Sequence, residues 1–339
     1  MNEYEEGRQR GKTLLVVEGD HEKNELLRLI FRCFPELDIE MENVWVYSTN
    51  IYMLYENIEE EYGTGWIDDD IDLPFVVSRK QGKAPYCYKQ DFTNIILIFD
   101  YERHDIKFSE TKILEMQDYF TDAADMGKLY INYPMIESYQ HFSTLPDADF
   151  INRRVPVSLQ PGKKYKELVR CDTVIGGLVD FPHKIENFLV RCLGKNSVQI
   201  CGECCEILLS VSKEDDIEIG VDRVLKEIRG DEIRQTAKHY FTKLLIETGY
   251  VQNGKTYWTF MRNIFQQIII HNIIKAYKIQ RKQEQIEQYK YKEYFEKLDL
   301  AKILKEQNKS SGDLQNGFIW VLNTCVFFVA EFNFLLVLG

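Results

Sequence analysis

Three acidic residues stand where two apolar runs of the sequence end. Leu14 to Val17 form the first run, and Glu18 and a glycine follow it directly. The second run, residues 95–99, ends in Asp100-Tyr101-Glu102. Such runs are typical of strands buried on both faces of a parallel sheet, and open α/β sheets bind ligands at the carboxyl ends of their strands. We therefore expect Glu18, Asp100 and Glu102 to meet at one edge of a sheet.

The chemistry of these three carboxylates points to a metal ion. Asp100 and Glu102 are two residues apart, so their side chains point the same way in extended backbone. Converging carboxylates repel one another, which raises their pKa values or recruits a cation. Hard oxygen ligands suit Mg²⁺ or Mn²⁺, and such an ion can polarise a phosphodiester and activate water. For Glu18 taken alone, the alternative to metal binding is a structural role, because an acid at the start of a helix is stabilised by the helix dipole.

The elements that must position these residues alternate between strands and helices. Strands are expected at 14–17, 44–48, 94–100 and 128–132, and helices at 22–34, 50–62, 110–120 and from 135 to 142. This alternation predicts an α/β fold with a mainly parallel sheet flanked by helices. Residues 63–92 are expected to form an irregular insertion, with the acid run at 68–72 as a solvated loop.

The second half of the chain has a different character. Residues 153–170 are basic and loop-like, and helical patterns dominate at 222–229, 231–248, 258–283 and 284–308. We expect a catalytic domain at 12–150 and a mainly helical domain at 151–339. The segment from Phe318 to Leu338 approaches the length of a membrane span, but Glu331 within it would be costly in lipid. A buried core segment, helix or strand, is therefore the prediction.

Composition limits the class of protein. The chain has 339 residues, 45% of them hydrophobic, and a formal net charge of −12, so it can bury a core, and any nucleic-acid surface must be a local patch or come from a partner. The polar start has no apolar signal region, and the eight cysteines are irregularly spaced, so a cytoplasmic location with reduced thiols is expected. The cluster Cys201, Cys204 and Cys205, with Cys192, is read as free thiols, with structural zinc as the alternative.

The motifs VVEG (16–19) and ILIFDYE (96–102) resemble the Toprim domain of topoisomerases, bacterial primases and OLD-type nucleases, over roughly residues 12–150. The resemblance implies that Glu18, Asp100 and Glu102 bind divalent metal and that Glu18 also acts as general acid or base. Glu102 stands where the family usually has Asp, and its extra methylene lengthens the ligand. OLD-type members also carry an acid at the start of the next helix, which implies Glu22 as a second-metal ligand.

The segment YPMIESYQHF (133–142) is similar to a stretch after the fourth strand in Toprim-like proteins of bacterial anti-phage systems, such as the RloB and abortive-infection groups. This similarity implies that Glu137 belongs to the metal or substrate site; a solvent-facing helix residue is the alternative. Arg103, His104 and Lys107 follow the acidic pair and are candidates to contact a scissile phosphate, with a surface charge run as the alternative. His21 and His141 are also expected near this edge.

These observations lead to a functional hypothesis. The sequence has no P-loop, GxSxG elbow or paired zinc knuckles, and no sign of a tyrosine-bearing topoisomerase domain or a primase zinc module. We expect a nuclease that uses Mg²⁺ or Mn²⁺ to hydrolyse RNA, tRNA included, or DNA.

The resemblance places such a nuclease as the effector of an anti-phage system, with its helical half binding substrate or an ATPase subunit of ABC or AAA type. No membrane contact is expected, and a homo-oligomer is compatible with the sequence. The alternatives are a non-catalytic interaction protein with a degenerate Toprim fold, favoured by the Asp-x-Glu departure, and a primase-like nucleotidyl transferase.

Overall fold

A five-stranded sheet lies at the centre of the computed structural model, which describes residues 12–159, 162–173, 175, 239, 243, 257–282 and 287–338. The strand order is β2-β1-β3-β5-β4. Strands β1 (Thr13–Val17), β2 (Val44–Val46), β3 (Asn94–Asp100) and β5 (Gly127–Asn132) are parallel, and β4 (Thr121–Asp122) pairs antiparallel with β5. The prediction of an α/β fold with a mainly parallel sheet is confirmed.

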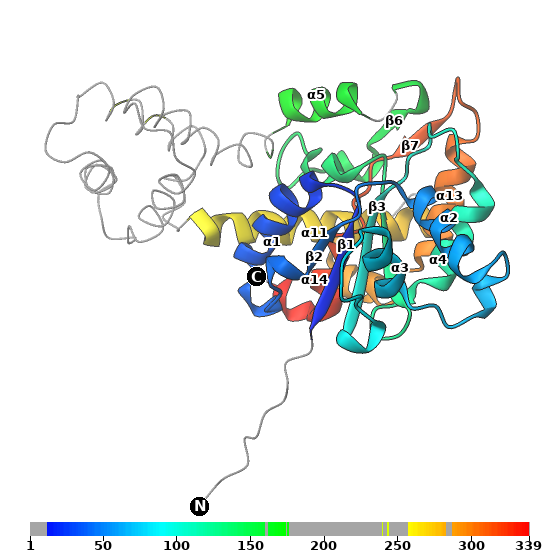
Figure 1. The fold of residues 1–339 in the computed structure, drawn as a ribbon. Coiled ribbons are helices and arrows are strands. Elements are labelled where there is room, and N and C mark those ends of the chain that lie inside the picture. The colour runs from blue at the N-terminus through cyan, green and yellow to red at the C-terminus, as the bar shows by residue number, and fades with distance from the viewer. Residues whose placement is uncertain are drawn as a thin grey trace, which may run out of the picture.

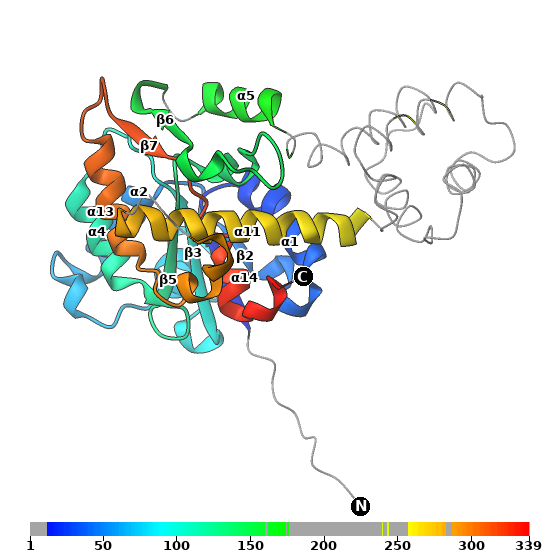
Figure 2. The same cartoon turned by 180° about the vertical axis from the view of Figure 1, so that it is seen from behind.

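Helices cover both faces of this sheet, which explains why its central strands are apolar along their whole length. On one face, α2 (Ile51–Tyr62) packs against both α3 (Leu73–Lys80) and α4 (Glu110–Tyr119). On the other, α1 (Arg28–Cys33) packs against the long helix α11 (Tyr257–Arg281). Figures 1 and 2 show α11 crossing behind and in front of the strands, respectively.

Side-chain caps fix the helices on the first face. Asn50 and Ser109 accept hydrogen bonds from backbone N–H groups at the starts of α2 and α4, as the expected helices at 50–62 and 110–120 require. The prediction that 63–92 is irregular was wrong for residues 73–80, which form α3. Asp72 caps α3 through the Phe75 N–H and also accepts from the Lys89 N–H, both at 3.0 Å, so this acid holds the segment together.

Two other expected helices differ in type. Residues 22–34 are divided into a π-helix, Glu22–Leu27, and the short α1, and π-helical turns are frequent at functional sites. The helix expected from 135 to 142 is only a 3₁₀-helix, Ile136–Gln140. The Asn323 side chain donates to the Ile136 carbonyl at 2.9 Å, and a distant residue thus takes the acceptor that an α-helix would use internally.

In the second half, the helix expected at 258–283 is confirmed as α11, whereas 284–308 is not one helix. It contains α12 (Tyr291–Phe295) and the start of α13 (Leu300–Ser311). The loop expected at 153–170 was wrong, because β6 (Arg154–Pro156) and most of α5 (Lys163–Asp172) lie there. The helix expected at 222–229, most of 231–248, and the cysteines at 192, 201, 204 and 205 lie outside the described residues.

The segment from Phe318 to Leu338 begins as a strand and continues as a helix. Strand β7 (Phe318–Trp320) pairs antiparallel with β6, and α14 (Phe327–Phe332) follows. Residues 321–330 are buried, as expected of a core segment. In the part of the chain that the structure describes, no helix combines the length and the apolar character that crossing a membrane requires.

Buried residues from both sides of position 150 form one hydrophobic cluster. Tyr133 and Leu322 exchange two backbone hydrogen bonds of 2.8 Å, and the Thr324 hydroxyl donates to the Ile131 carbonyl at 2.7 Å. The end of the chain is therefore attached to the end of β5. The division into two domains at 150 stays a prediction.

Candidate metal site at the carboxyl edge of the sheet

Glu18 and Asp100 meet at the ends of two neighbouring strands. Glu18 follows β1 and Asp100 ends β3, and these strands pair in parallel with Val17 opposite Ile98. Glu18 Oε2 accepts a hydrogen bond from the Asp100 backbone N–H at 3.2 Å. The Asp100 side chain is 4% exposed, and its Oδ1 has no hydrogen-bond partner among the described residues. The geometry thus brings together the first two residues of the expected site.

Glu102 and Glu22 belong to the same group of carboxylates. Glu102 adopts a left-handed backbone conformation with φ of 44°, which is costly for a residue with a side chain and recurs at functional sites. Glu22 lies in the π-helix, and its Oε2 accepts from the Gly19 N–H at 2.9 Å. A Cβ on Gly19 would lie 3.1 Å from that oxygen, so the missing side chain gives Glu22 room.

Four carboxyl groups at this edge have raised pKa values. Burial, followed by the charge of Glu102, raises the pKa of Glu18 to about 8. Burial and the charges of Glu18 and Glu22 raise the pKa of Asp100 well above its ordinary value. Burial also raises the pKa values of Glu22 and Glu102, and nearby Asp105 adds to the effect on Glu102. A cation among these groups would relieve their repulsion.

Glu137 differs from these four because it has cationic neighbours. Its Oε1 lies 2.8 Å from Lys166 Nζ and 3.0 Å from His21 Nε2. Both contacts are ion pairs without hydrogen-bond alignment. Burial alone would raise the pKa of Glu137, but these two cations outweigh it and lower the pKa. Glu137 is 4% exposed, so a solvent-facing position, the alternative for this residue, is wrong.

The two cations beside Glu137 are charged at neutral pH. Burial lowers the pKa of His21, but Glu137 and Glu25 outweigh it and raise the pKa to about 9. Burial also lowers the pKa of Lys166, but the contact with Glu137 and the charges of Asp100 and Glu22 outweigh burial, so the pKa is raised above its ordinary value. His21 thus lies near the edge as expected. Lys166 was missed because it falls in a stretch expected to be a loop and belongs to no motif.

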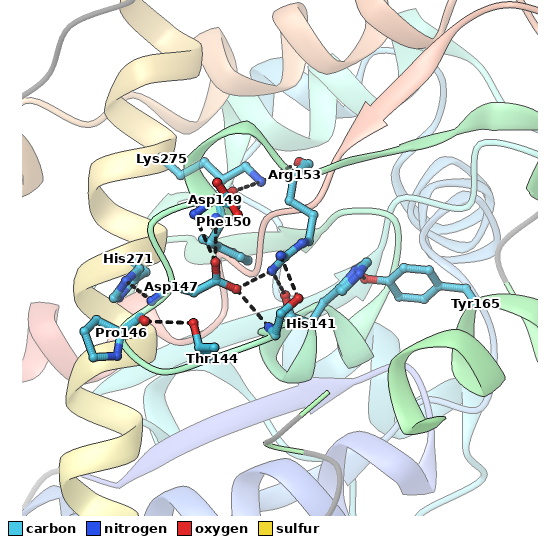
Figure 3. A network of polar contacts seen from close by, with 11 residues as sticks. His141, Thr144, Pro146, Asp147, Asp149, Phe150, Arg153, Tyr165, His271 and Lys275 are labelled. Atoms are coloured by element: carbon cyan, nitrogen blue, oxygen red, sulfur yellow. Dashed lines mark hydrogen bonds and ion pairs between the residues drawn. The ribbon is translucent and has the colours of Figure 1, made fainter. Parts of the chain in front are cut away.

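Helix α5 lies beyond the carboxyl ends of the strands (Figure 1). Lys166 therefore reaches these strand ends from α5. The neighbouring residue Tyr165 is buried, and its hydroxyl contacts His141 Nδ1 at 3.1 Å (Figure 3). His141 is therefore a contact between α5 and the segment after β5. This contact fixes the position from which Lys166 reaches Glu137.

A polar network ties the segment after His141 to α11 (Figure 3). Asp147 Oδ2 accepts from Arg153 Nη1 at 2.6 Å, and the Asp147 backbone N–H donates to His271 Nε2 at 3.0 Å. Lys275 Nζ, fully buried, donates to the carbonyls of Phe150 and Arg153 at 2.7 and 2.6 Å. The network gives these buried polar groups hydrogen-bond partners and so supports the elements around the site.

Asn132 is a second residue that the sequence reasoning missed. It ends β5 and is the register partner of Asp100. Its Oδ1 accepts from the Cys325 N–H at 3.2 Å, while its Nδ2 has no hydrogen-bond partner in the described part of the chain. A signal for it existed, since Asn132 ends a buried strand as Glu18 and Asp100 do.

The three basic residues after Glu102 are engaged elsewhere. Arg103 Nε donates to the Ser311 carbonyl at 3.2 Å, the His104 ring contacts the Val157 carbonyl, and Lys107 Nζ pairs with Glu56. The structure therefore does not join them to the carboxylates, and their role in substrate binding stays a prediction.

The side chains fit a metal ion in chemistry but are not arranged around one. No three His, Cys, Asp or Glu side chains of the described residues form a group that could hold an ion. Glu18 and Glu22 instead accept from backbone N–H groups. The donor set is nevertheless all oxygen, and Asp100 Oδ1 is a buried acceptor without a donor, which suits a hard cation.

Comparison with known proteins adds no assignment to this geometry. A scan against protein-family models, a search of curated proteins and a search of solved structures each found no match.

Proposed function

We propose that this protein is a divalent-metal-dependent nuclease with a Toprim-like site at the carboxyl edge of its sheet. Glu18, Asp100 and Glu102 would hold Mg²⁺ or Mn²⁺, with Glu22 as a further ligand. One observation carries the proposal. Four carboxyl groups repel one another at one edge of the sheet, Asp100 and Glu22 buried and Glu18 and Glu102 partly buried, and one buried oxygen, Asp100 Oδ1, has no donor among the described residues.

Each residue has a part in the proposed reaction. A bound ion would polarise the phosphodiester and activate water. Glu18 would also serve as general acid or base, the second role that the resemblance to Toprim nucleases implies for it. Glu137, already neutralised by two cations, keeps Lys166 beside the carboxylates instead of binding metal.

The biological role rests on the resemblance of the two motifs to Toprim nucleases. By that resemblance the substrate is RNA, tRNA included, or DNA, and the protein is an effector of bacterial anti-phage defence. The mainly helical residues after 150 would bind the substrate or an ATPase subunit of ABC or AAA type.

A non-catalytic interaction protein is the second candidate, and two observations favour it. No group of three ligands is preformed among the described residues, and Glu102 stands where Toprim nucleases usually have Asp. A protein of this kind would keep the fold and the buried acids but would not hydrolyse nucleic acid.

Cleavage assays separate the two candidates. Wild type, Glu18→Gln and Asp100→Asn are incubated with labelled RNA and DNA in Mg²⁺, Mn²⁺ or EDTA. We expect cleavage that needs the metal and falls about 100-fold or more in both variants, because each removes a charged ligand. Glu60→Gln, a matched change at an exposed position of α2, should cleave like wild type.

Thermal melting supplies a readout that does not depend on activity. Mn²⁺ should raise the melting temperature of wild type and of Glu60→Gln, but not of Glu18→Gln, because an ion that binds only the folded state stabilises it. Without metal at pH 8, Glu18→Gln should melt above wild type, because a repelling buried charge is gone. Wild type that neither binds Mn²⁺ nor cleaves would reject the nuclease, and binding without cleavage would favour the second candidate.

A further inference from the structure

A pocket of about 720 Å³ opens beside the candidate metal site, at the outer strand of the sheet. Its wall includes the turn after β1, the strand β2 and the end of α3. The side chains that matter here are Asp20, Lys23, Trp45, Ser48, Lys80 and Lys83. The Ser48 backbone N–H donates to the Glu18 carbonyl at 2.9 Å, so a single hydrogen bond links the pocket to the first candidate ligand.

The pocket is locally positive in an acidic protein. Lys23, Lys80 and Lys83 line it against the acids Asp20 and Glu42, whereas the whole chain has a net charge of −12. Lys23 Nζ donates to a backbone carbonyl, that of Val44, at 2.7 Å. Within the described part of the chain, neither Lys23 nor Lys83 forms an ion pair with a carboxylate.

Lys83 is held in place by an aromatic ring. Its Nζ lies 3.8 Å from the centre of the Trp45 ring, a cation–π contact. Burial lowers the pKa of Lys83, nearby Cys87 acts in the opposite direction, and the positive charge of Lys23 lowers the pKa, so the two ammonium groups repel each other. An anion between them would remove this repulsion.

The wall of the pocket also offers an acceptor and a strained residue. Gln81 Nε2 donates to the Val46 carbonyl at 2.6 Å, which leaves Gln81 Oε1 buried with no partner among the described residues. Ser48, which follows β2, has a left-handed backbone conformation with φ of 66°. Glu102, which follows β3, is also left-handed, so both strands that flank β1 are followed by a residue of this kind. A ligand for this wall needs a negative charge and a hydrogen-bond donor, which a phosphate group and a base or ribose supply together.

We propose that this pocket binds one unpaired nucleotide of a nucleic-acid strand, with Lys23 and Lys83 on its phosphate. The identity of the ligand as part of the substrate rests on the proposed nuclease function. The volume lies in the range of small-molecule sites, large enough for a nucleotide. A base stacked inside a duplex cannot enter such a pocket, so the protein selects single-stranded segments next to the bond at the carboxylates.

Binding is measured by fluorescence anisotropy with the full chain, a short labelled oligonucleotide and EDTA, so that neither metal nor cleavage contributes. Lys83→Gln and the exposed Lys80→Gln should each weaken binding several-fold, and Lys83→Gln should reduce the salt dependence by about one phosphate contact. Lys83→Arg, which keeps the charge, should bind like wild type. Lys305→Gln, an exposed lysine of α13 that does not line the pocket, is the matched control.

The outcomes separate this proposal from the nuclease proposal. Equal losses in Lys83→Gln and Lys305→Gln, equal affinity for single strand and duplex, or no binding by wild type would each overturn the pocket. Wild type that cleaves with an affinity independent of Lys83 leaves the nuclease standing and rejects the pocket. Wild type that binds single strands through Lys83 without ever cleaving supports the pocket and rejects the nuclease.

Discussion

Burial raises the pKa of every acidic residue at the sheet edge, and cationic neighbours offset it at Glu137. Glu137 is buried, but Lys166 and His21 keep its pKa low. Asp100 is buried and Glu18 partly buried without such partners, and their pKa values are raised. Desolvation acts on all three, so the difference comes from the cations. Glu137 is therefore an anchor for α5, whereas the strand-end acids remain available to an external cation.

His141 makes folding sensitive to acid. Burial, followed by the charges of Arg153 and Lys275, lowers its pKa from 6.5 to about 4. Between these pH values the unfolded chain binds a proton that the folded chain does not. The contribution of neutral His141 to stability is thus complete above pH 6.5 and is lost as the pH falls to 4. Replacing it by Gln should remove up to about 3 kcal/mol of this pH dependence, measured by urea unfolding.

The matched control for this change is His239→Gln, at an exposed position. Its free energy of unfolding should follow the wild-type curve between pH 7 and pH 4. If the curve of His141→Gln also ran parallel to that of wild type, the buried neutral state of His141 would be ruled out as a source of acid sensitivity.

The half-exposed ion pair between Lys166 and Glu137 adds to the buried contacts that position α5. Lys166 lies 2.8 Å from Glu137, whose side chain is 5% exposed, and His21 is the other cation in contact. Lys166→Met leaves a buried carboxylate with a single partner. We expect the free energy of unfolding to fall by about 1–2 kcal/mol, less than for a fully buried pair, because His21 remains. Urea denaturation measures this loss.

The same helix supplies a control. Lys163 pairs with Glu167 at 3.8 Å, and both side chains are well exposed, so Lys163→Met should cost less than about 0.5 kcal/mol. Equal losses in the two variants would mean that the contact with Glu137 adds nothing to the stability of α5.

Elements with a local cause were predictable from the sequence, and those with a distant cause were not. The strands β1 and β3 were predicted because their apolar runs are long and end sharply. The 3₁₀-helix at Ile136–Gln140 was not predicted, because Asn323 takes one of its carbonyls. Helix α5 was hidden by its basic residues, since only Tyr165, Val169 and their contacts show which face is buried.

The residues of the candidate site also differ in whether the local sequence could predict them. Glu18, Asp100 and Glu102 were found because each follows a recognisable strand in the sequence. Lys166 reaches the same edge from a helix that follows the sheet in the chain, and nothing in its local sequence indicates this. Asn132 could have been found by extending the strand-end argument to β5, because it is the register partner of Asp100.

At the scale of the whole molecule, the residues after 257 cover one face of the sheet and bond to the end of β5. Helix α11 covers one face, and Leu322 and Thr324 bond to the backbone at the end of β5. The Tyr101 hydroxyl, directly after Asp100, donates to Asn308 Oδ1 of α13 at 2.6 Å. Residues after 257 therefore hold the strand ends on which the candidate ligands lie.

Residues 12–150 alone should consequently fail to fold cooperatively. Without α11 the fragment would expose one apolar face of its sheet, and the backbone of Tyr133 would lose both bonds to Leu322. The full chain should show one urea transition by near-ultraviolet circular dichroism and by tryptophan fluorescence, whereas the fragment should show no sharp transition by either. A fragment that unfolded sharply, with its own near-ultraviolet signal, would establish position 150 as the border between independent domains.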